Sequence, residues 1–383
     1  MIKMTFQLPE KFAQIPRYQL LYSHPSPIHP LKSLAPPPGH HPNHPKISIF
    51  AKREDQSSPL ACSGNKYRKL EYIVPDILSD VPKYGYHEHH PPGEKIFPSA
   101  DRQPCSSQKA QSKATTLALV LLHCGTGGGL RTASDKGSFL RTGNVQINRL
   151  LGADVQVFEE GDPVADDAHP VLERLRGQGE IPYWIPGGAS LHPLGGLGYA
   201  RAAAEIAEQE QTLQLEGSGR FDVIFVACGS GSTHGGLIAG FKMLDKMGGS
   251  TAPRKLMGIL NSPTKPRVYH EERVLTFARR AGAFIGLEED NIGKEDVWLE
   301  DGFVGTGYGI LDEHTSLALE RMAQMEGVIL DPVYTAKVAS AMMYWVQEKG
   351  VTEYAEEHGL KHVNVLFIHT GGQAALGAYA DRL

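Results

Sequence analysis

The sequence predicts an α/β protein with a largely parallel sheet flanked by helices, and three observations support this. In the second half of the chain, short apolar runs alternate with helix-like segments, and a glycine turn usually separates the two. The chain has 383 residues, enough for two domains, and 41% of them are hydrophobic, enough for a buried core. Its 42 glycines supply the tight turns that strand-to-helix connections need.

The individual elements follow from local periodicity. Residues 15–35 form an extended arm punctuated by prolines, and a strand is expected from residue 46. Further strands are expected at 117–122, 154–158, 223–227, 256–260 and 363–368, and helices at 69–78 and 144–151. From about residue 79 to residue 113 neither helical nor strand periodicity is present.

Composition excludes several classes of function. The net charge of -5 is spread over interspersed acids and bases, so we expect no nucleic-acid partner. There is no run of about 18 apolar residues for a membrane span, and the start of the chain lacks an apolar signal-peptide core, so a cytoplasmic protein is expected. The four cysteines are far apart and predict free thiols. The histidine clusters at 39–44 and 87–90 lie among prolines and predict solvated loops, so no metal site is expected.

The segment around Lys66 is the most informative in the chain. Lys66 follows Gly64 and Asn65 in a turn that leads into a helix-like run. Unpaired N–H groups and the positive dipole end of a helix lower the pKa of a nearby ammonium group, and a neutral amine can attack a carbonyl. Lys66 is therefore suited to form a Schiff base with pyridoxal phosphate. By itself, an Asn-Lys pair fits a surface lysine in a turn equally well.

A second segment predicts a phosphate site. Residues 229–236 follow an apolar strand, open a helix and read Gly-Ser-Gly-Ser-Thr-His-Gly-Gly. Such residues let backbone N–H groups converge on an anion at the helix start, although a close packing turn would also use glycines. A Walker loop would need a lysine here, and a dinucleotide fingerprint would need a different glycine spacing and an acidic residue after the next strand, which ends at Leu260-Asn261. A single phosphate is the better ligand.

These segments, together with three others, resemble the family of 1-aminocyclopropane-1-carboxylate (ACC) deaminase and D-cysteine desulfhydrase. The others are Gly307-Tyr308-Gly309, Leu330-Asp331-Pro332-Val333-Tyr334-Thr335 and Phe367-Ile368-His369-Thr370-Gly371-Gly372. The resemblance implies the two-domain tryptophan synthase β-like fold (fold type II), with a small domain at 66–190 and a large one formed by 1–65 and 191–383. It also implies pyridoxal phosphate as cofactor, a small amino acid as substrate and a homodimer.

The same resemblance assigns roles to individual residues. It implies that Lys66 anchors the cofactor and that Tyr334 and Tyr308 act in catalysis. The implied cofactor contacts are Asn65, Lys69, Gly229, Ser230, Gly231, Ser232, Thr233, Thr335 and Thr370. Either tyrosine would otherwise be explained as a core aromatic residue with a solvated hydroxyl.

Thr335 and Thr370 bear on the choice of reaction. ACC has no α-proton, so opening its ring requires a strongly electron-withdrawing, protonated pyridine, which a neighbouring carboxylate stabilises. ACC deaminases resemble one another in having glutamate and leucine where this chain has Thr335 and Thr370. A hydroxyl can hydrogen-bond a neutral pyridine, which suits α,β-elimination with Lys66 removing the α-proton. The resemblance therefore predicts conversion of D-cysteine to pyruvate, hydrogen sulfide and ammonia, with ACC deamination as the alternative.

The resemblance breaks at one place. The family has a Ser-Asn-His/Gln-Thr-Arg segment that holds the substrate, and no such string occurs between residues 79 and 117; Ser106-Ser107-Gln108 comes nearest. Either the chain has diverged here, or the recorded sequence contains a frameshift or splice-boundary error. An inactive homologue that binds pyridoxal phosphate is therefore a third hypothesis. Ser63, where glycine normally precedes Gly64, is a smaller departure.

Overall fold

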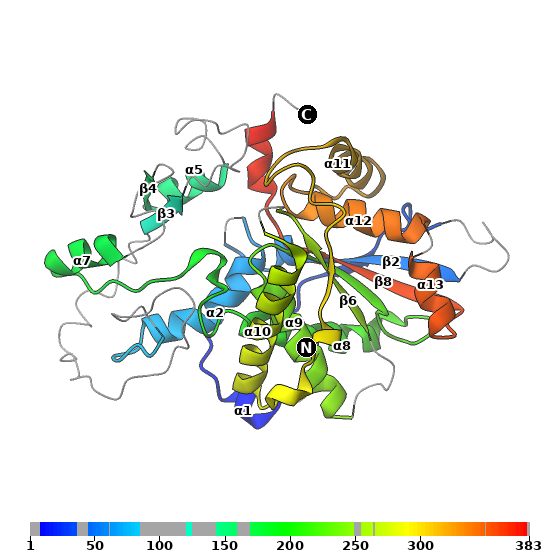
Figure 1. Ribbon diagram of the computed structural model, residues 1–383, viewed down its shortest axis with the longest axis horizontal. Helices are drawn as coiled ribbons and strands as arrows, with labels where there is room; N and C mark the ends of the chain where they lie inside the picture. The colour runs from blue at the N-terminus through cyan, green and yellow to red at the C-terminus, as the bar shows by residue number, and fades with distance from the viewer. Residues whose placement is uncertain are drawn as a thin grey trace.

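The computed structural model describes residues 8–36, 45–60, 62–84, 120–124, 143–158, 169–248, 254–262, 265–348 and 350–380 (Figure 1). The strands are β1 (Ile28–Pro30), β2 (Lys46–Arg53), β3 (Val120–Cys124), β4 (Asp154–Phe158), β5 (Val223–Cys228), β6 (Lys255–Leu260), β7 (Trp298–Glu300) and β8 (His362–His369). The α-helices are α1 (Glu10–Ala13), α2 (Asn65–Ile77), α5 (Gly143–Leu150), α7 (His169–Gly177), α8 (Leu197–Leu213), α9 (Ser232–Lys246), α10 (Arg267–Ile285), α11 (Glu313–Glu326), α12 (Thr335–Gln347) and α13 (Gly350–Glu357). The 3₁₀ helices are η1 (Glu54–Gln56), η2 (Gly187–Ala189), η3 (Glu289–Asn291), η4 (Lys294–Asp296) and η5 (Gln373–Tyr379).

The main sheet is six-stranded, in the order β1-β2-β8-β5-β6-β7. Only β1 is antiparallel to its neighbour, and the other four pairings are parallel. β8 lies between β2 and β5 and pairs with β2 from Lys46↔His362 to Arg53↔His369. A second, two-stranded parallel sheet joins β3 and β4. The predicted α/β architecture is confirmed.

The main sheet is buried on both faces, because helices cover each of them. Ile224 and Val226 belong to an apolar cluster with residues of α8, α9 and α10. Val223 and Phe225, the alternate residues of the same strand, belong to a cluster with α11, α12 and α13. Figure 1 shows α11 and α12 on one side of the sheet and α8, α9 and α10 on the other. Side chains of a strand alternate between its faces, so continuous apolar runs fill both clusters.

The N-terminal arm is fixed to α2, the helix that carries Lys66. Arg17 Nε donates to Glu71 Oε2 over 2.7 Å, and the backbone N–H groups of Leu20 and Leu21 donate to Glu71 Oε1 over 3.0 and 3.1 Å. On its other side α2 packs against α8, and its Tyr72 joins the same apolar cluster as that helix. The small sheet of β3 and β4 falls within the predicted small domain, and the division into domains stays a prediction.

Most predicted elements occur within two or three residues of their expected bounds, and α2 differs in an informative way. It begins at Asn65, four residues before the expected start, so Lys66 lies in the first helical turn. The first N–H groups of a helix have no intrahelical acceptor. Asn65 N donates instead to Thr370 O over 3.1 Å, so the helix can begin against the end of β8. In the described part of the chain, no helix is long and apolar enough to cross a bilayer.

Candidate active site

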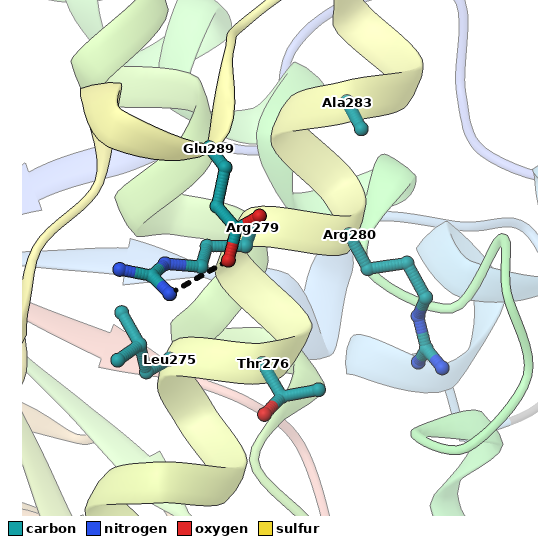
Figure 2. Close-up of a pocket in the computed structure, with 6 residues that line it drawn as sticks. All are labelled: Leu275, Thr276, Arg279, Arg280, Ala283 and Glu289. Carbon is teal, nitrogen blue, oxygen red and sulfur yellow. Dashed lines mark hydrogen bonds and ion pairs between the residues drawn. The ribbon is translucent and has the colours of Figure 1, made fainter. Parts of the chain in front are cut away.

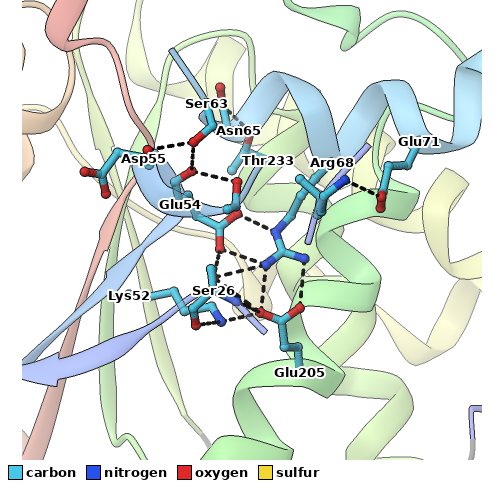
Figure 3. Close-up of polar contacts among 12 residues, drawn as sticks. Ser26, Lys52, Glu54, Asp55, Ser63, Asn65, Arg68, Glu71, Glu205 and Thr233 are labelled. Atoms are coloured by element: carbon cyan, nitrogen blue, oxygen red, sulfur yellow. Dashed lines mark hydrogen bonds and ion pairs between the residues drawn. The ribbon is translucent and has the colours of Figure 1, made fainter. Parts of the chain in front are cut away.

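Three predicted segments meet at the carboxyl ends of the parallel strands, where α/β proteins bind ligands. Asn65 Nδ2 donates to Thr233 Oγ1 over 3.2 Å, which joins the start of α2 to the predicted phosphate loop (Figure 3). The Asn65 N–H contact with Thr370 joins the same turn to the end of β8. Lys66 therefore lies next to the phosphate loop, although the segments are far apart in sequence.

Two glycines allow the start of α2 to approach the end of β8. A Cβ on Gly64 would lie 2.7 Å from Thr370 O, and one on Gly371 would lie 2.7 Å from Ser63 O. Either methyl group would force the two backbones apart. Ser63 fits this turn, because its side chain is buried and its hydroxyl donates to Asp55 O over 2.6 Å.

A buried cluster of charges around Arg68 holds α2 in place (Figure 3). Arg68 Nη2 donates to Glu54 Oε1 and to Glu205 Oε1, both over 2.8 Å. Lys52 also binds Glu205. Burial would raise the pKa of Glu205, but Arg68 and Lys52 hold that pKa below its usual value. Removing one partner of such a cluster leaves a charge buried and unpaired, so the cluster fixes the first turn of α2.

Lys66 combines exposure with a lowered pKa. Its side chain is exposed, and its ammonium donates to Asn65 Oδ1 over 3.0 Å. Nevertheless, desolvation lowers the pKa of Lys66, and the carboxylate of Asp331 opposes this shift. The side chain is thus accessible to solvent, while protein atoms surround its ammonium group closely. A lysine in such surroundings is more readily neutral, and a neutral amine is the reactive form.

Lys69 is fully buried one helical turn further along α2. Its ammonium donates to Gly188 O over 2.9 Å, and no carboxylate pairs with it among the described residues. Desolvation and then the neighbouring ammonium of Lys66 hold the pKa of Lys69 well below its usual value. A buried cation without a counter-ion indicates a site that an anionic ligand completes.

The predicted phosphate loop brings hydroxyl groups and the start of a helix close to Gly188, the residue to which Lys69 donates. Gly231 has a φ of 98°, and α9 begins at the next residue. Ser232 and Thr233 are buried there. Ser190 was not predicted: its Oγ lies 2.7 Å from Ser230 Oγ and accepts from Ser232 N over 3.3 Å. The preceding Gly187-Gly188 pair is the one local signal that could have indicated this second loop.

Tyr308 and Tyr334 lie together, as their predicted roles require. Their hydroxyl groups share a short hydrogen bond, and the ring centroids are 6.0 Å apart. Burial raises the pKa of both phenols, well above the usual value for Tyr334, so both stay protonated at neutral pH. One of the two hydroxyl protons forms the hydrogen bond between the tyrosines, and the other can be donated to a ligand.

Asp331 lies where α12 begins and is the acceptor for four groups. Its Oδ2 accepts from Val333 N and Tyr334 N, both over 2.9 Å. Its Oδ1 accepts from Thr335 N over 2.8 Å and from the Thr335 hydroxyl over 2.7 Å. The single proton of Thr335 is thus directed to Asp331. By contrast, the hydroxyl of Thr370 has no hydrogen-bond partner among the described residues.

A surface pocket of about 330 Å³ lies along α10 (Figure 2). Arg279 Nη1 pairs with Glu289 Oε1 over 2.9 Å, whereas Arg280 points the other way and donates to Leu191 O and His192 O, both over 3.1 Å. No predicted site residue lines this pocket. Through these carbonyls Arg280 supports the loop that carries Ser190.

Several predictions fall outside the described residues. The histidine clusters lie there, as do Ser106-Ser107-Gln108 and nearly all of the interval that lacks the family's substrate segment. In the described part of the chain, Cys62 and Cys228 are free thiols, exposed and buried respectively.

Comparison with known proteins identifies the relatives of this chain. A family model described as pyridoxal-phosphate dependent enzyme matches residues 120–371. An ACC deaminase of Burkholderia vietnamiensis is 34% identical over 377 residues, covering 96% of this chain and 97% of the relative. A probable ACC deaminase of Cryptococcus neoformans is 34% identical over 384 residues, covering 97% and 96%. A solved ACC deaminase homologue has a TM-score of 0.65 at 24% identity, covering 97% of this chain and 96% of that one, which shows the fold alone.

Proposed function

The chain belongs to the pyridoxal-phosphate dependent enzyme family, and within it we propose that the protein deaminates ACC to 2-oxobutanoate and ammonia. The sheet and the relatives confirm the predicted tryptophan synthase β-like fold, the cofactor and a lyase or deaminase activity. The comparisons favour ACC over the D-cysteine that the two threonines predicted, because the curated relatives named above are ACC deaminases.

The residues present fit pyridoxal phosphate. Lys69 is a buried cation without a carboxylate partner in the described residues, and the hydroxyl groups of Ser230, from the phosphate loop, and Ser190 lie beside its acceptor, Gly188. These groups would hold the phosphate, and Lys66 would hold the aldehyde carbon. The cofactor supplies an electron sink for bond cleavage at the substrate's α-carbon.

The observation that carries the proposal is the hydrogen bond from Thr335 to Asp331. The sequence alone suggested that Thr335 donates to a neutral pyridine. The proton of Thr335 goes to Asp331, and its Oγ also accepts from Asp331 N over 2.7 Å. With its one remaining lone pair Thr335 can only accept a hydrogen bond from a ligand, and accepting favours a protonated ring nitrogen. The buried negative charge of Asp331, one hydroxyl group away, favours it further. Thr335 and Asp331 together thus favour the protonated, strongly electron-withdrawing ring that opening a cyclopropane requires, even without a glutamate at position 335.

Elimination of sulfide from D-cysteine is the second candidate function, and Thr370 favours it. Its unpartnered hydroxyl is available to donate to a neutral ring nitrogen, which would weaken electron withdrawal. Tyr308 and Tyr334 would position the substrate in either reaction.

Two product assays on the purified holoenzyme test the proposal. We expect 2-oxobutanoate from ACC, and we expect Thr335→Val to reduce this turnover at least about tenfold, equivalent to about 1.4 kcal/mol of transition-state stabilisation. Lys66→Ala serves as the inactive control. Sulfide from D-cysteine without 2-oxobutanoate from ACC would reverse the order of the two candidates, and neither product would support the inactive homologue.

A further inference from the structure

Asn261 is a buried polar residue that no part of the fold uses. It follows Leu260 at the carboxyl end of β6, and its side chain is 1% exposed. Among the described residues, neither its Oδ1 nor its Nδ2 has a hydrogen-bond partner. Buried amides are almost always hydrogen-bonded, because an unpaired one loses its interactions with water and gains none. The unpaired amide therefore indicates a missing partner.

The surroundings of Asn261 show where that partner would lie. A Cβ on Gly229 would be 3.1 Å from Asn261 Oδ1 and 3.4 Å from Tyr334 Cε1. Gly229 begins the phosphate loop, and Tyr334 belongs to the tyrosine pair. The amide thus lies where these two parts of the site meet. His234 Nδ1 is also unpartnered in the described residues, but it lies within the packed interior against Gly258, where a ligand has no room.

We propose that the carboxamide of Asn261 hydrogen-bonds bound pyridoxal phosphate at the edge of the site between the phosphate loop and Tyr334. A carboxamide offers both a donor and an acceptor, so it suits a phosphate oxygen or a polar atom of the ring. The inference depends on the family's cofactor and not on ACC as the substrate.

Cofactor titration of the apoprotein tests the role of Asn261. In Asn261→Leu and Asn261→Ala, we expect the Kd for pyridoxal phosphate, measured from the visible absorption band, to rise about tenfold, which corresponds to about 1.4 kcal/mol. The melting temperature of the apoprotein should stay the same or rise, because the substitutions remove no hydrogen bond. A merely structural asparagine would give the opposite result.

Asn364 is the matched control. It is equally buried on β8, and its Oδ1 also has no partner among the described residues, but its Nδ2 donates to Glu216 O over 2.8 Å and to Arg220 O over 3.0 Å. Asn364→Ala should lower the apoprotein melting temperature and leave the Kd for pyridoxal phosphate near that of the wild type. The comparison separates loss of a ligand contact from loss of a contact within the fold.

The inference is overturned if either folded Asn261 variant binds pyridoxal phosphate as tightly as the wild type. If the Asn261 variants bind pyridoxal phosphate more weakly, titration with inorganic phosphate locates the contact. A parallel loss of affinity for inorganic phosphate places the contact at the phosphate group, and an unchanged affinity places it at the ring. A wild type that binds the cofactor but does not turn over ACC would refute the proposed function and leave the role of Asn261 intact.

Discussion

Asp331→Asn tests the most specific electrostatic feature of the site. The side chain is fully buried, and each of its two oxygens accepts two hydrogen bonds at the start of α12. Asparagine keeps the shape, but one oxygen becomes an NH₂ group that cannot accept. Whichever way the amide turns, two donors lose their acceptor.

The magnitude follows from these contacts. Hydrogen bonds to a charged group contribute about 1.5–3 kcal/mol each, and a negative charge at a helix N-terminus adds about 0.3–1 kcal/mol. Losing two such bonds and the charge should therefore reduce the free energy of unfolding by at least about 3 kcal/mol. Turnover of ACC should also fall at least about tenfold, because the negative charge that favours a protonated ring nitrogen is lost.

Urea denaturation of the apoprotein measures the first effect, with Asp312→Asn as the control. Asp312 is the N-cap of α11 and accepts one hydrogen bond there, from Thr315 N over 2.8 Å. Asparagine caps helices as well as aspartate does, so this control should lose less than about 0.5 kcal/mol. If Asp331→Asn loses no more than the control, Asp331 does not organise the start of α12, and the reasoning about the proton of Thr335 fails.

Two further predictions concern the phosphate site. Gly188 has a φ of +66°, and a Cβ there would lie 2.5 Å from Ser230 Oγ, whereas Gly359 has a φ of +65° and no atom within 4 Å. Both glycine-to-alanine variants should lose about 1 kcal/mol of stability through backbone strain, but only Gly188→Ala should weaken pyridoxal phosphate binding; equal affinities would contradict the assigned loop. The lowered pKa of Lys69 predicts proton uptake when inorganic phosphate binds in alkaline buffer, because the anion raises that pKa. In the apoprotein, the pKa of Lys69 is lower in the folded state than in the unfolded state. Between these two pKa values the unfolded state binds more protons, so the contribution of Lys69 to stability rises with pH in that window. Calorimetry in buffers of different ionisation enthalpy measures the uptake, and its absence would show that Lys69 does not meet the phosphate.

Much of the fold could be predicted because its strands are buried on both faces. The runs at 223–227 and 256–260 contain no polar side chain, and the run at 363–368 contains only one, Asn364; they became β5, β6 and β8 with small changes at their ends. β1 and β7 have three residues each, too few to show any periodicity. The start of α2 was expected too late, because the acceptor for Asn65 N comes from Thr370, some 300 residues further along the chain.

The candidate site was predictable where its chemistry is local. Lys66 and the phosphate loop have distinctive neighbours in sequence. Asn261 has no such neighbours, and Ser190 has only the preceding Gly187-Gly188 pair, because the position of each residue beside the phosphate loop is set by the fold. Asp331 was visible as part of a motif, but its hold on the Thr335 proton depends on the turn at the start of α12. The homodimer and the domain boundaries stay predictions.

Locating the lysine that binds the cofactor tests the central claim most directly. The holoenzyme would be reduced with borohydride, which fixes the bond between cofactor and lysine, and the modified peptide would be sequenced by mass spectrometry. We expect the pyridoxyl group on Lys66, and we expect Lys66→Ala to lose the visible absorption band while keeping its folded stability, because this exposed side chain packs little. A pyridoxyl group on any other lysine, or a visible band that survives Lys66→Ala, would contradict the site described for this protein.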